Sequence, residues 1–349
     1  MTKCLNFISI LLGGLLFTLN MAYAKGDVEI YGKAHASIDV AYDGANDQTS
    51  ISNNSTRLNF RGSYDLILDM KAIWVFESDI DVTGETAGIT SRNRYIGLAG
   101  LMGKVFIGIY DTPVKKLGRS VDIFSETIGD SRAIMGAQSN GVNTFDQRAK
   151  NAFVYMTPKA LGTQFTVLYS TGNSDTNTDS DLDNKKDELM GLSLEFERAN
   201  FLTGVAYHNG RHVNRVGDEG IRVATQFKSE TGVLGGVYEI LKSKSGVTEL
   251  DRSAYALNSA YNIGLITVTA EYIQANNNKK TQNSNASMYA LGILQSLSKN
   301  TRLYAIYAAN KNSKNANYSI AAGEHGDQVI PFEVGDHPEA FSLGIMHNF

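Results

Sequence analysis

Cysteine is almost absent from this chain of 349 residues, because Cys4 is the single one. It falls within an N-terminal segment with the features of an export signal: a basic residue, an apolar run from Leu5 to Leu19, and the motif Ala22-Tyr-Ala24. An A-x-A motif after such a run is typical of signal-peptide cleavage. We therefore predict a signal peptide over residues 1–24 and a mature chain over residues 25–349 without a thiol. That excludes a disulfide, a cysteine nucleophile and a cysteine-ligated metal.

Long apolar runs are missing after residue 24, where no segment approaches the ~18 consecutive apolar residues of a membrane-spanning helix. If the mature chain lies in a membrane, a closed β-barrel is the remaining architecture, because lipid cannot pair the backbone groups of an open sheet edge. An excess of positive charge is missing too, since the formal net charge is −4. We therefore expect no nucleic-acid partner.

The sequence does contain long segments in which apolar and polar side chains alternate. The longest runs from Val28 to Tyr42, and the alternation recurs over Leu68–Asp79 and Ile266–Tyr272. A period of two residues is typical of a β-strand with one apolar and one polar face. Strands of soluble sandwiches are usually about 5–6 residues long, whereas a tilted membrane strand needs about 9–11. The lengths therefore favour a membrane barrel.

Tight turns and longer polar loops alternate between the predicted strands. Seven turns and eight loops join sixteen strands, and an even count of this kind is typical of bacterial outer-membrane barrels. We therefore predict an all-β protein, a 16-stranded antiparallel transmembrane β-barrel with short periplasmic turns and long external loops. The turns are predicted near Asp65, Leu101, Ala160, Asn200, Glu230, Ile263 and Lys299, and the loops near residues 43–53, 80–90, 111–147, 172–186, 210–217, 242–250, 275–286 and 311–337.

Four sequence features together carry a family resemblance. Val28-Glu-Ile-Tyr-Gly32 opens the first strand, Thr56-Arg-Leu-Asn-Phe-Arg-Gly62 lies in the second, Ser91-Arg-Asn-Arg-Tyr-Ile-Gly-Leu98 lies in the fourth, and the chain ends in Phe349. In this order the chain resembles the general diffusion porins of the Gram-negative bacterial outer membrane. The resemblance implies a non-enzymatic, water-filled channel for passive diffusion of ions and small hydrophilic solutes. It also implies a homotrimer, with no cofactor, whose third external loop folds into the lumen.

The third external loop of this sequence is Asp111–Gln147, which the resemblance makes the constriction loop. A connection of this length inside a compact fold is uncommon, and is usually functional or disordered. This one is not low in complexity. It carries enough apolar side chains to pack against a wall, namely Val114, Leu117, Val121, Ile123, Phe124 and Ile128.

In general porins, arginines of the early strands form a basic wall opposite acids of the inserted loop. By their places in the motifs and after the loop, the matching residues are Arg57, Arg92 and Arg148. The alternative is that these arginines contact lipid headgroups. One departure is that Gly108 is followed by Ile109, where the family usually has a further arginine. Fewer wall charges and a negative net charge suggest a mild cation preference.

For the opposing acids of the loop we nominate Asp122, Glu126 and Asp130. Their spacing of four places them on one face if the loop is locally helical. The alternative is that they form a solvated loop face.

The terminal Phe349 is expected to serve export, because in this family the last aromatic residue is part of the signal read by the barrel assembly machinery. The pattern of Phe341, Leu343 and Ile345 places it on the lipid face. Outer-membrane lipid and lipopolysaccharide are the other expected partners, and the expected location is the cell outer membrane.

Two other functions remain as alternatives. A substrate-selective outer-membrane channel would add aromatic ladders to the same fold. A barrel hydrolase would need a catalytic constellation, but the histidines are scattered and no G-x-S-x-G motif accompanies them. His208 and His212 have a metal-like spacing without an H-E-x-x-H motif. Residues Asp179–Asp183 begin like a calcium loop, but Asn184 stands where glycine is needed, so we expect no metal site.

Overall fold

The protein is described here by a computed structural model, which covers residues 26–42, 46–84, 89–136, 145–172, 188–212, 215–243, 251–320 and 333–349. The predicted signal peptide and the calcium-like segment Asp179–Asp183 lie outside these residues. Among the described residues, no helix is long and apolar enough to cross a membrane.

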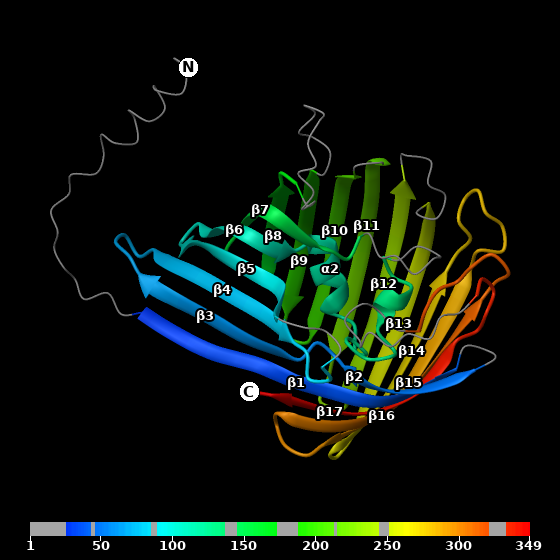
Figure 1. Ribbon diagram of the computed structural model, residues 1–349. Coiled ribbons are helices and arrows are strands. Elements are labelled where there is room, and N and C mark those ends of the chain that lie inside the picture. Colours follow the sequence, from blue (N-terminus) through cyan, green and yellow to red (C-terminus); the bar gives the residue numbers. More distant parts are fainter. Residues whose placement is uncertain are drawn as a thin grey trace.

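Antiparallel strands make up most of the described chain and close into a barrel (Figure 1). Apart from one interrupted strand, each strand pairs with the next along the chain, and the last strand pairs with the first. The strands are β1 (Gly26–Tyr42), β2 (Asp47–Asn53), β3 (Arg57–Asp65), β4 (Lys71–Ile80), β5 (Ile89–Gly100), β6 (Gly103–Asp111), β7 (Arg148–Met156), β8 (Thr163–Ser170), β9 (Leu189–Arg198), β10 (Phe201–His212), β11 (Arg215–Lys228), β12 (Gly232–Ser243), β13 (Arg252–Ile263), β14 (Ile266–Ala275), β15 (Ala286–Ser296), β16 (Thr301–Asn312) and β17 (Glu339–Asn348).

The second strand of the barrel is interrupted, which explains why seventeen segments form sixteen barrel strands. β1 pairs with β2 along its second half and with β3 along its first half. Between them Ser55 has a left-handed backbone, with φ +57°, so the ladder breaks there. The predicted loop at residues 43–53 is therefore wrong over residues 47–53, which are β2. The predicted 16-stranded antiparallel barrel is confirmed.

The two faces of each strand meet different surroundings. On β1, Val28 and Ile30 are 68% and 61% exposed on the outer face, whereas His35 and Asp39 point inward and are buried. Apolar side chains on the outer face match lipid, and polar ones on the inner face match a water-filled interior. The alternation seen in the sequence thus becomes the inside and outside of the barrel.

The connection between β6 and β7 lies inside the barrel, as predicted for the third loop. It contains the helix α2 (Pro113–Arg119) and the short 3-10 helix η1 (Ser131–Ala133). Pro113 starts α2 after the N-cap Thr112, whose side chain accepts a hydrogen bond from the Lys115 backbone N–H. The helix packs against β8, β9, β10 and β11 (Figure 1).

A wall of small side chains lets the loop approach the barrel closely. Leu117 of α2 meets the wall at Gly204 of β10, where an added Cβ would lie 2.8 Å from a Leu117 methyl group. The apolar side chains of the loop are fully buried against wall alanines. This core includes Val114, Leu117, Val121, Phe124, Ile128, Ile134 and Met135 of the loop with Ala206, Ala224, Ala254, Ala256, Ala290 and Ala308 of the wall.

The barrel closes at a seam between the last residue and β1. Phe349 exchanges two backbone hydrogen bonds with Gly32, of 2.8 Å and 3.1 Å. Its ring lies over Gly32, and the C-terminus ends beside β1 (Figure 1). Gly32 is needed there because a larger residue would meet the ring.

Replacing Gly32 with alanine should weaken this seam. The added Cβ would lie 2.4 Å from the Arg57 carbonyl oxygen, a backbone atom that cannot move aside, and 2.5 Å from the Phe349 ring. Overpacking of this kind costs about 1–3 kcal/mol, or roughly 5 °C in the unfolding midpoint. The measurement is the temperature at which unboiled protein loses its folded mobility on a detergent gel. Gly100→Ala, where the Cβ has an ordinary 3.5 Å contact, is the control; equal midpoints would contradict the assigned seam.

Candidate functional site

Glu126 of the inserted loop lies at the centre of a group of basic side chains. Its Oε1 is 2.6 Å from Arg57 Nη1 of β3 and 2.7 Å from Arg119 Nη2 at the end of α2. Lys33 of β1 contacts the other oxygen, and Arg92 of β5 approaches to 3.9 Å. The Glu126 side chain is only 4% exposed. A carboxylate so enclosed is stabilised by ion pairs less screened than those on an open surface.

Asp130 supports the same group from within the loop. It binds Arg119 at 3.1 Å and Arg132 at 3.2 Å, and it accepts a hydrogen bond of 2.8 Å from the Glu126 backbone N–H. Burial raises the pKa of Asp130, but Arg132 and Arg119 outweigh it and hold that pKa below the usual value. Asp130 is therefore an anionic support for the arginines.

Asp122 does not belong to this group. Its carboxylate accepts hydrogen bonds from the Phe124 backbone N–H at 2.9 Å and from the Ser131 hydroxyl, also at 2.9 Å. Burial and the neighbouring Asp130 raise the pKa of Asp122 to about 6, against Arg119 and the hydrogen bonds. The expectation of three acids on one helical face is wrong: the helix ends at Arg119, and Glu126 has φ +65°.

Arg92 reaches the lumen through a break in strand register. The pairing of β4 with β5 shifts by one residue between Phe76 and Ser78. Before the shift, Arg94 of β5 pairs with Phe76, whose side chain points outward. In a regular strand Arg92, two residues from Arg94, would point outward as well. A β-bulge redirects side chains, so Arg92 points inward instead. Inside the barrel Arg92 binds Asp79 of β4 at 2.9 Å.

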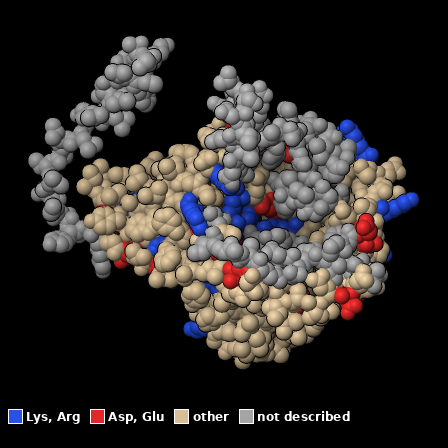
Figure 2. All heavy atoms as spheres, viewed as in Figure 1, with Lys and Arg blue, Asp and Glu red and all other residues tan. Residues whose placement is uncertain are grey.

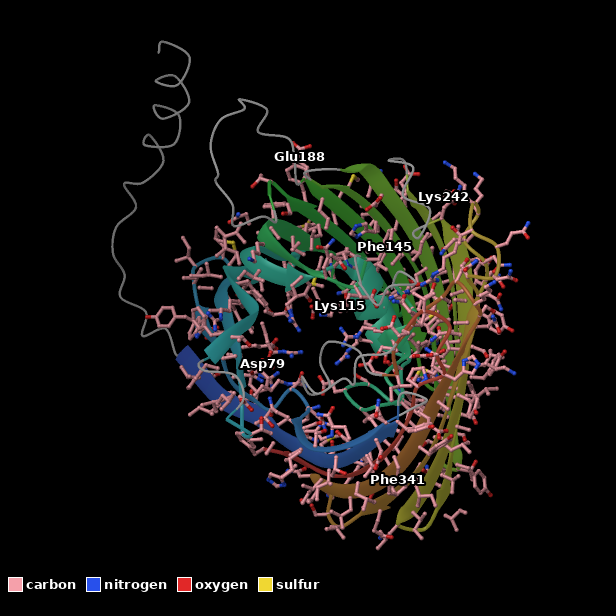
Figure 3. All side chains as sticks on the ribbon, turned by 45° about the vertical axis from the view of Figure 1, so that its right-hand side comes forward. Asp79, Lys115, Phe145, Glu188, Lys242 and Phe341 are labelled. Carbon is pink, nitrogen blue, oxygen red and sulfur yellow. The ribbon has the colours of Figure 1, made fainter. Side chains whose placement is uncertain are left out.

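Arg148 belongs to a second ion-paired group at the start of the loop. Its Nε lies 3.0 Å from Asp111 Oδ1, which Lys115 of α2 also binds at 3.1 Å. Asn93 completes the group with hydrogen bonds to Asp111. Figure 3 shows Lys115 on the helix inside the barrel, and Figure 2 shows basic side chains gathered in the central hollow.

The predicted basic residues therefore all lie in the lumen, but they divide between two groups. Arg57 binds Glu126, and Arg92 approaches it while binding Asp79. Arg148 binds Asp111 instead. Sequence reasoning missed Lys33, although its polar-face position on β1 was an available signal; the structure pairs it with Arg57.

Sequence reasoning also missed the other charged residues of the two groups, namely Arg119, Asp79, Asp111, Lys115 and Arg132. Their contacts depend on the fold of the loop, for which the sequence has no local signal beyond a proline after a threonine. The register of β4 against β5 and of β6 against β7 likewise brings Asp79 and Asp111 into place.

The loop is clamped to the opposite wall by a chain of buried charges. Arg222 of β11 binds Asp146, near the end of the loop, and Glu239 of β12, each at 2.6 Å. Arg222 also donates a hydrogen bond of 3.0 Å to the Val114 carbonyl of α2. Arg252 of β13 binds Glu239 at 3.1 Å. The loop is thus fixed at both of its legs.

The histidines singled out in the sequence have structural surroundings. His208 is fully buried, with its ring centroid 5.2 Å from that of Phe145. The side chain of His212 lies outside the described part. Within the part of the chain that the structure describes, no group of three or more His, Cys, Asp or Glu side chains could hold a metal ion.

Known sequences resemble this chain over most of its length. Residues 15–315 match the family described as Gram-negative porin. The major outer membrane protein P.IB of Neisseria sicca is 24% identical over 290 residues, which cover 77% of this chain and 75% of that protein. P.IB of Neisseria meningitidis serogroup B is 32% identical over 104 residues, covering 27% of this chain and 31% of that one.

Solved structures share the fold. The anion-selective porin from Comamonas acidovorans superposes with a TM-score of 0.79 at 22% identity, covering 93% of this chain and 100% of that one. OmpF of Salmonella typhi, in complex with daunomycin, superposes with a TM-score of 0.67 at 15% identity, covering 92% and 97%. The chain therefore belongs to the Gram-negative porin family, and it forms an outer-membrane diffusion channel.

Proposed function

We propose that the inserted loop sets the size limit of a passive pore, and that the ion-paired side chains at its tip set the ion preference. The observation that carries this is the contact of Glu126 with Lys33 and Arg57. The loop packs on β8 to β11 at one side and reaches β1 and β3 at the other, so it crosses the lumen. Ions and small hydrophilic solutes pass through the space that it leaves.

We propose a preference for anions, in place of the mild cation preference suggested by the net charge. Seven basic and four acidic side chains form the ion pairs of the two groups, an excess of three positive charges among the described residues. Glu126 is one of the four acids already counted, so it does not reduce this excess any further. Lumen charges act on permeating ions at close range, so they outweigh charge elsewhere.

We propose no catalytic role. His35, on the lumen face, is engaged by the Tyr304 hydroxyl at 3.0 Å and is buried. A substrate-selective channel is the alternative to a general pore, and saturating solute flux would distinguish it.

The remaining assignments are proposed from family membership. They are cleavage after Ala24, a homotrimer in contact with outer-membrane lipid and lipopolysaccharide, and delivery by the barrel assembly machinery. A Vibrio cholerae outer-membrane protein with this fold, OmpT, is described in a trimer form. Phe349 suits the role of assembly signal because it is half exposed on the outer surface while its backbone completes the barrel seam.

Glu126→Gln should shift the reversal potential further toward anions, because it leaves Lys33, Arg57 and Arg119 without their shared counter-charge. One unit charge at roughly 8 Å in water is worth about 0.5 kcal/mol, or roughly twofold in the permeability ratio. Arg57→Ala should shift it toward cations. Asp65→Asn, at the exposed end of β3, is the control in the same bilayer measurement. If Glu126→Gln behaves like Asp65→Asn, the constriction does not lie at Glu126.

The anion preference should rise as the pH falls through about 6. Asp122 has a pKa of about 6, so it is neutral below that pH and adds a negative charge to the lumen above it. The same shift affects stability. Because the pKa of Asp122 is higher in the folded protein than in the unfolded chain, Asp122 stabilises the packed loop below about pH 4, and this stabilisation is lost as the pH rises through about 6. Reversal potentials measured across this range should show the step in the parent protein and lose it in Asp122→Asn. A step of the same size in that variant would refute the assignment to Asp122.

Shortening the loop within residues 121–135 should raise single-channel conductance by roughly twofold, because a barrel of this size is open without an inserted segment. It should also admit larger sugars in a liposome-swelling assay. Folded mobility on an unboiled detergent gel checks that the barrel itself is intact. Unchanged conductance and sugar cutoff in an intact barrel would place the constriction elsewhere.

A further inference from the structure

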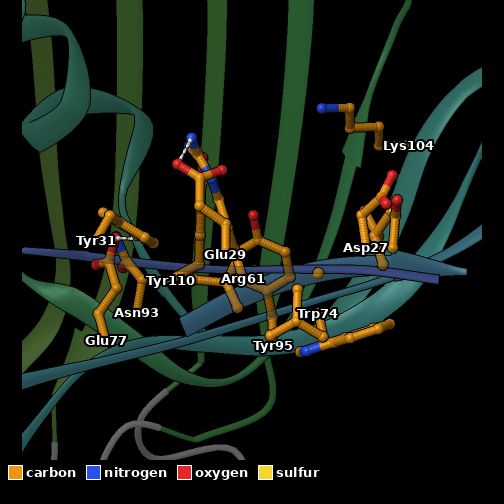
Figure 4. Close-up of a pocket in the computed structure, with 15 residues that line it drawn as sticks. Asp27, Glu29, Tyr31, Arg61, Trp74, Glu77, Asn93, Tyr95, Lys104 and Tyr110 are labelled. Atoms are coloured by element: carbon orange, nitrogen blue, oxygen red, sulfur yellow. Dashed lines mark hydrogen bonds and ion pairs between the residues drawn. The ribbon is translucent and has the colours of Figure 1, made fainter. Parts of the chain in front are cut away.

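A groove of about 500 Å³ lies on the inner wall formed by β1, β3, β4, β5 and β6, beside the constriction (Figure 4). Tyr31 of this groove precedes Lys33 by two positions on β1, and Arg61 follows Arg57 by four on β3. The groove therefore faces the lumen, on the side of the barrel that ends in the tight periplasmic turns.

Aromatic rings form one side of the groove. Tyr95 stacks on Phe106 with ring centroids 4.2 Å apart, and Tyr110 meets Tyr95 edge-on at 5.7 Å. Tyr31 stands nearby with the Arg61 guanidinium 4.8 Å above its ring. The guanidinium of Arg61 thus already lies over the face of a tyrosine ring, which attracts positive charge.

Glu77 supplies a negative charge that the wall does not neutralise. Arg61 is fully engaged by Glu29, through two contacts of 2.7 Å. Glu77 accepts a hydrogen bond of 3.0 Å from the Tyr31 hydroxyl, but it forms no ion pair with any residue that the structure describes. Its other oxygen has no hydrogen-bond partner among those residues either. A half-buried carboxylate beside aromatic rings, without a cation, is a site for a cation.

The charge of the groove is opposite to that of the constriction. Three acids and two bases line it, namely Asp27, Glu29 and Glu77 with Arg61 and Lys104 (Figure 4). The Arg61–Glu29 pair is internally neutral, which leaves Asp27, Lys104 and Glu77, and of these Glu77 contacts Tyr31.

We propose that this groove binds the primary ammonium group of a small organic amine. Glu77 holds the charge, and Tyr95 and Tyr110 cover the alkyl chain. The proposal rests on the diffusion channel proposed above, to which it adds a retention site for amines on the periplasmic side of the constriction.

The test uses purified full-length protein in planar bilayers, with 1,4-diaminobutane added on the side of the tight turns. We expect a saturable reduction of the current, and 1,4-butanediol, which has the same length without charge, should not produce it. Glu77→Gln keeps an oxygen for the Tyr31 hydroxyl and removes the charge. It should weaken the apparent affinity for the diamine by roughly tenfold or more, the worth of a hydrogen bond to a charged group. Tyr31→Phe should retain the block, because the charge of Glu77 remains.

Glu230→Gln is the matched control, since Glu230 is an exposed acid in a tight turn at the same end of the barrel, outside the groove. It should keep the parent affinity. If the diamine blocks the parent and Glu77→Gln equally, the proposed site is overturned. If 1,4-butanediol blocks the current as well as 1,4-diaminobutane does, the proposal is also overturned, because the groove then takes uncharged hydroxylated solutes. A conducting parent that the diamine does not block also refutes the site, whereas absence of conductance would count against the channel itself.

Discussion

The position of the constriction depends on one buried guanidinium, that of Arg222. It joins a loop residue, Asp146, to a wall residue, Glu239, and it also holds the Val114 carbonyl of α2. Ionic groups removed from water are stable only when geometry and hydrogen bonding compensate the lost hydration; removing one partner typically costs about 3–5 kcal/mol. The two legs of the loop therefore cannot slide independently along the wall.

Apolar packing alone would not fix the loop in this way. The loop lies on a wall rich in alanine and glycine, which permits close approach, and it also meets larger side chains such as Ile273, Met288 and Ile306. Directional bonds supply the register: Gln226 and Asn258 both donate to the Val121 carbonyl, at 3.3 Å and 3.0 Å. The small wall residues bring the loop close, and the polar contacts decide where it stops.

Much of the fold could be predicted because it depends on local periodicity. Alternation predicted that each strand has an apolar and a polar face, and turn signals placed the tight connections correctly. The interruption of the second strand could not be predicted, because the left-handed Ser55 depends on pairing with β1. The site was harder still. The spacing of Asp122 and Glu126 would put them on one face only in a helix, but Glu126 has a non-helical conformation and contacts residues distant in sequence, Arg57 and Lys33.

Glu126 illustrates why counting charges along the sequence misjudges a pore. An acid that faces a basic wall across water sets up a transverse field, whereas an acid in contact with that wall cancels part of it. Here the contact leaves the surplus arginines and lysines to act on solutes. Burial of Glu126 also keeps water from screening its ion pairs, so the loop tip stays on the wall.

The positive charge of the constriction and the negative charge of the groove then act over different ranges. At about 3.3 Å per residue, Tyr31 and Lys33 are separated by roughly 7 Å, less than the Debye length of about 8 Å at physiological ionic strength. The positive excess at the constriction therefore extends over the groove and opposes any diffuse attraction of cations to it. Glu77 can retain a cation only by direct contact, in a groove that tyrosine rings also line. The constriction selects by the sign of its excess charge at longer range, and the groove by fit at short range.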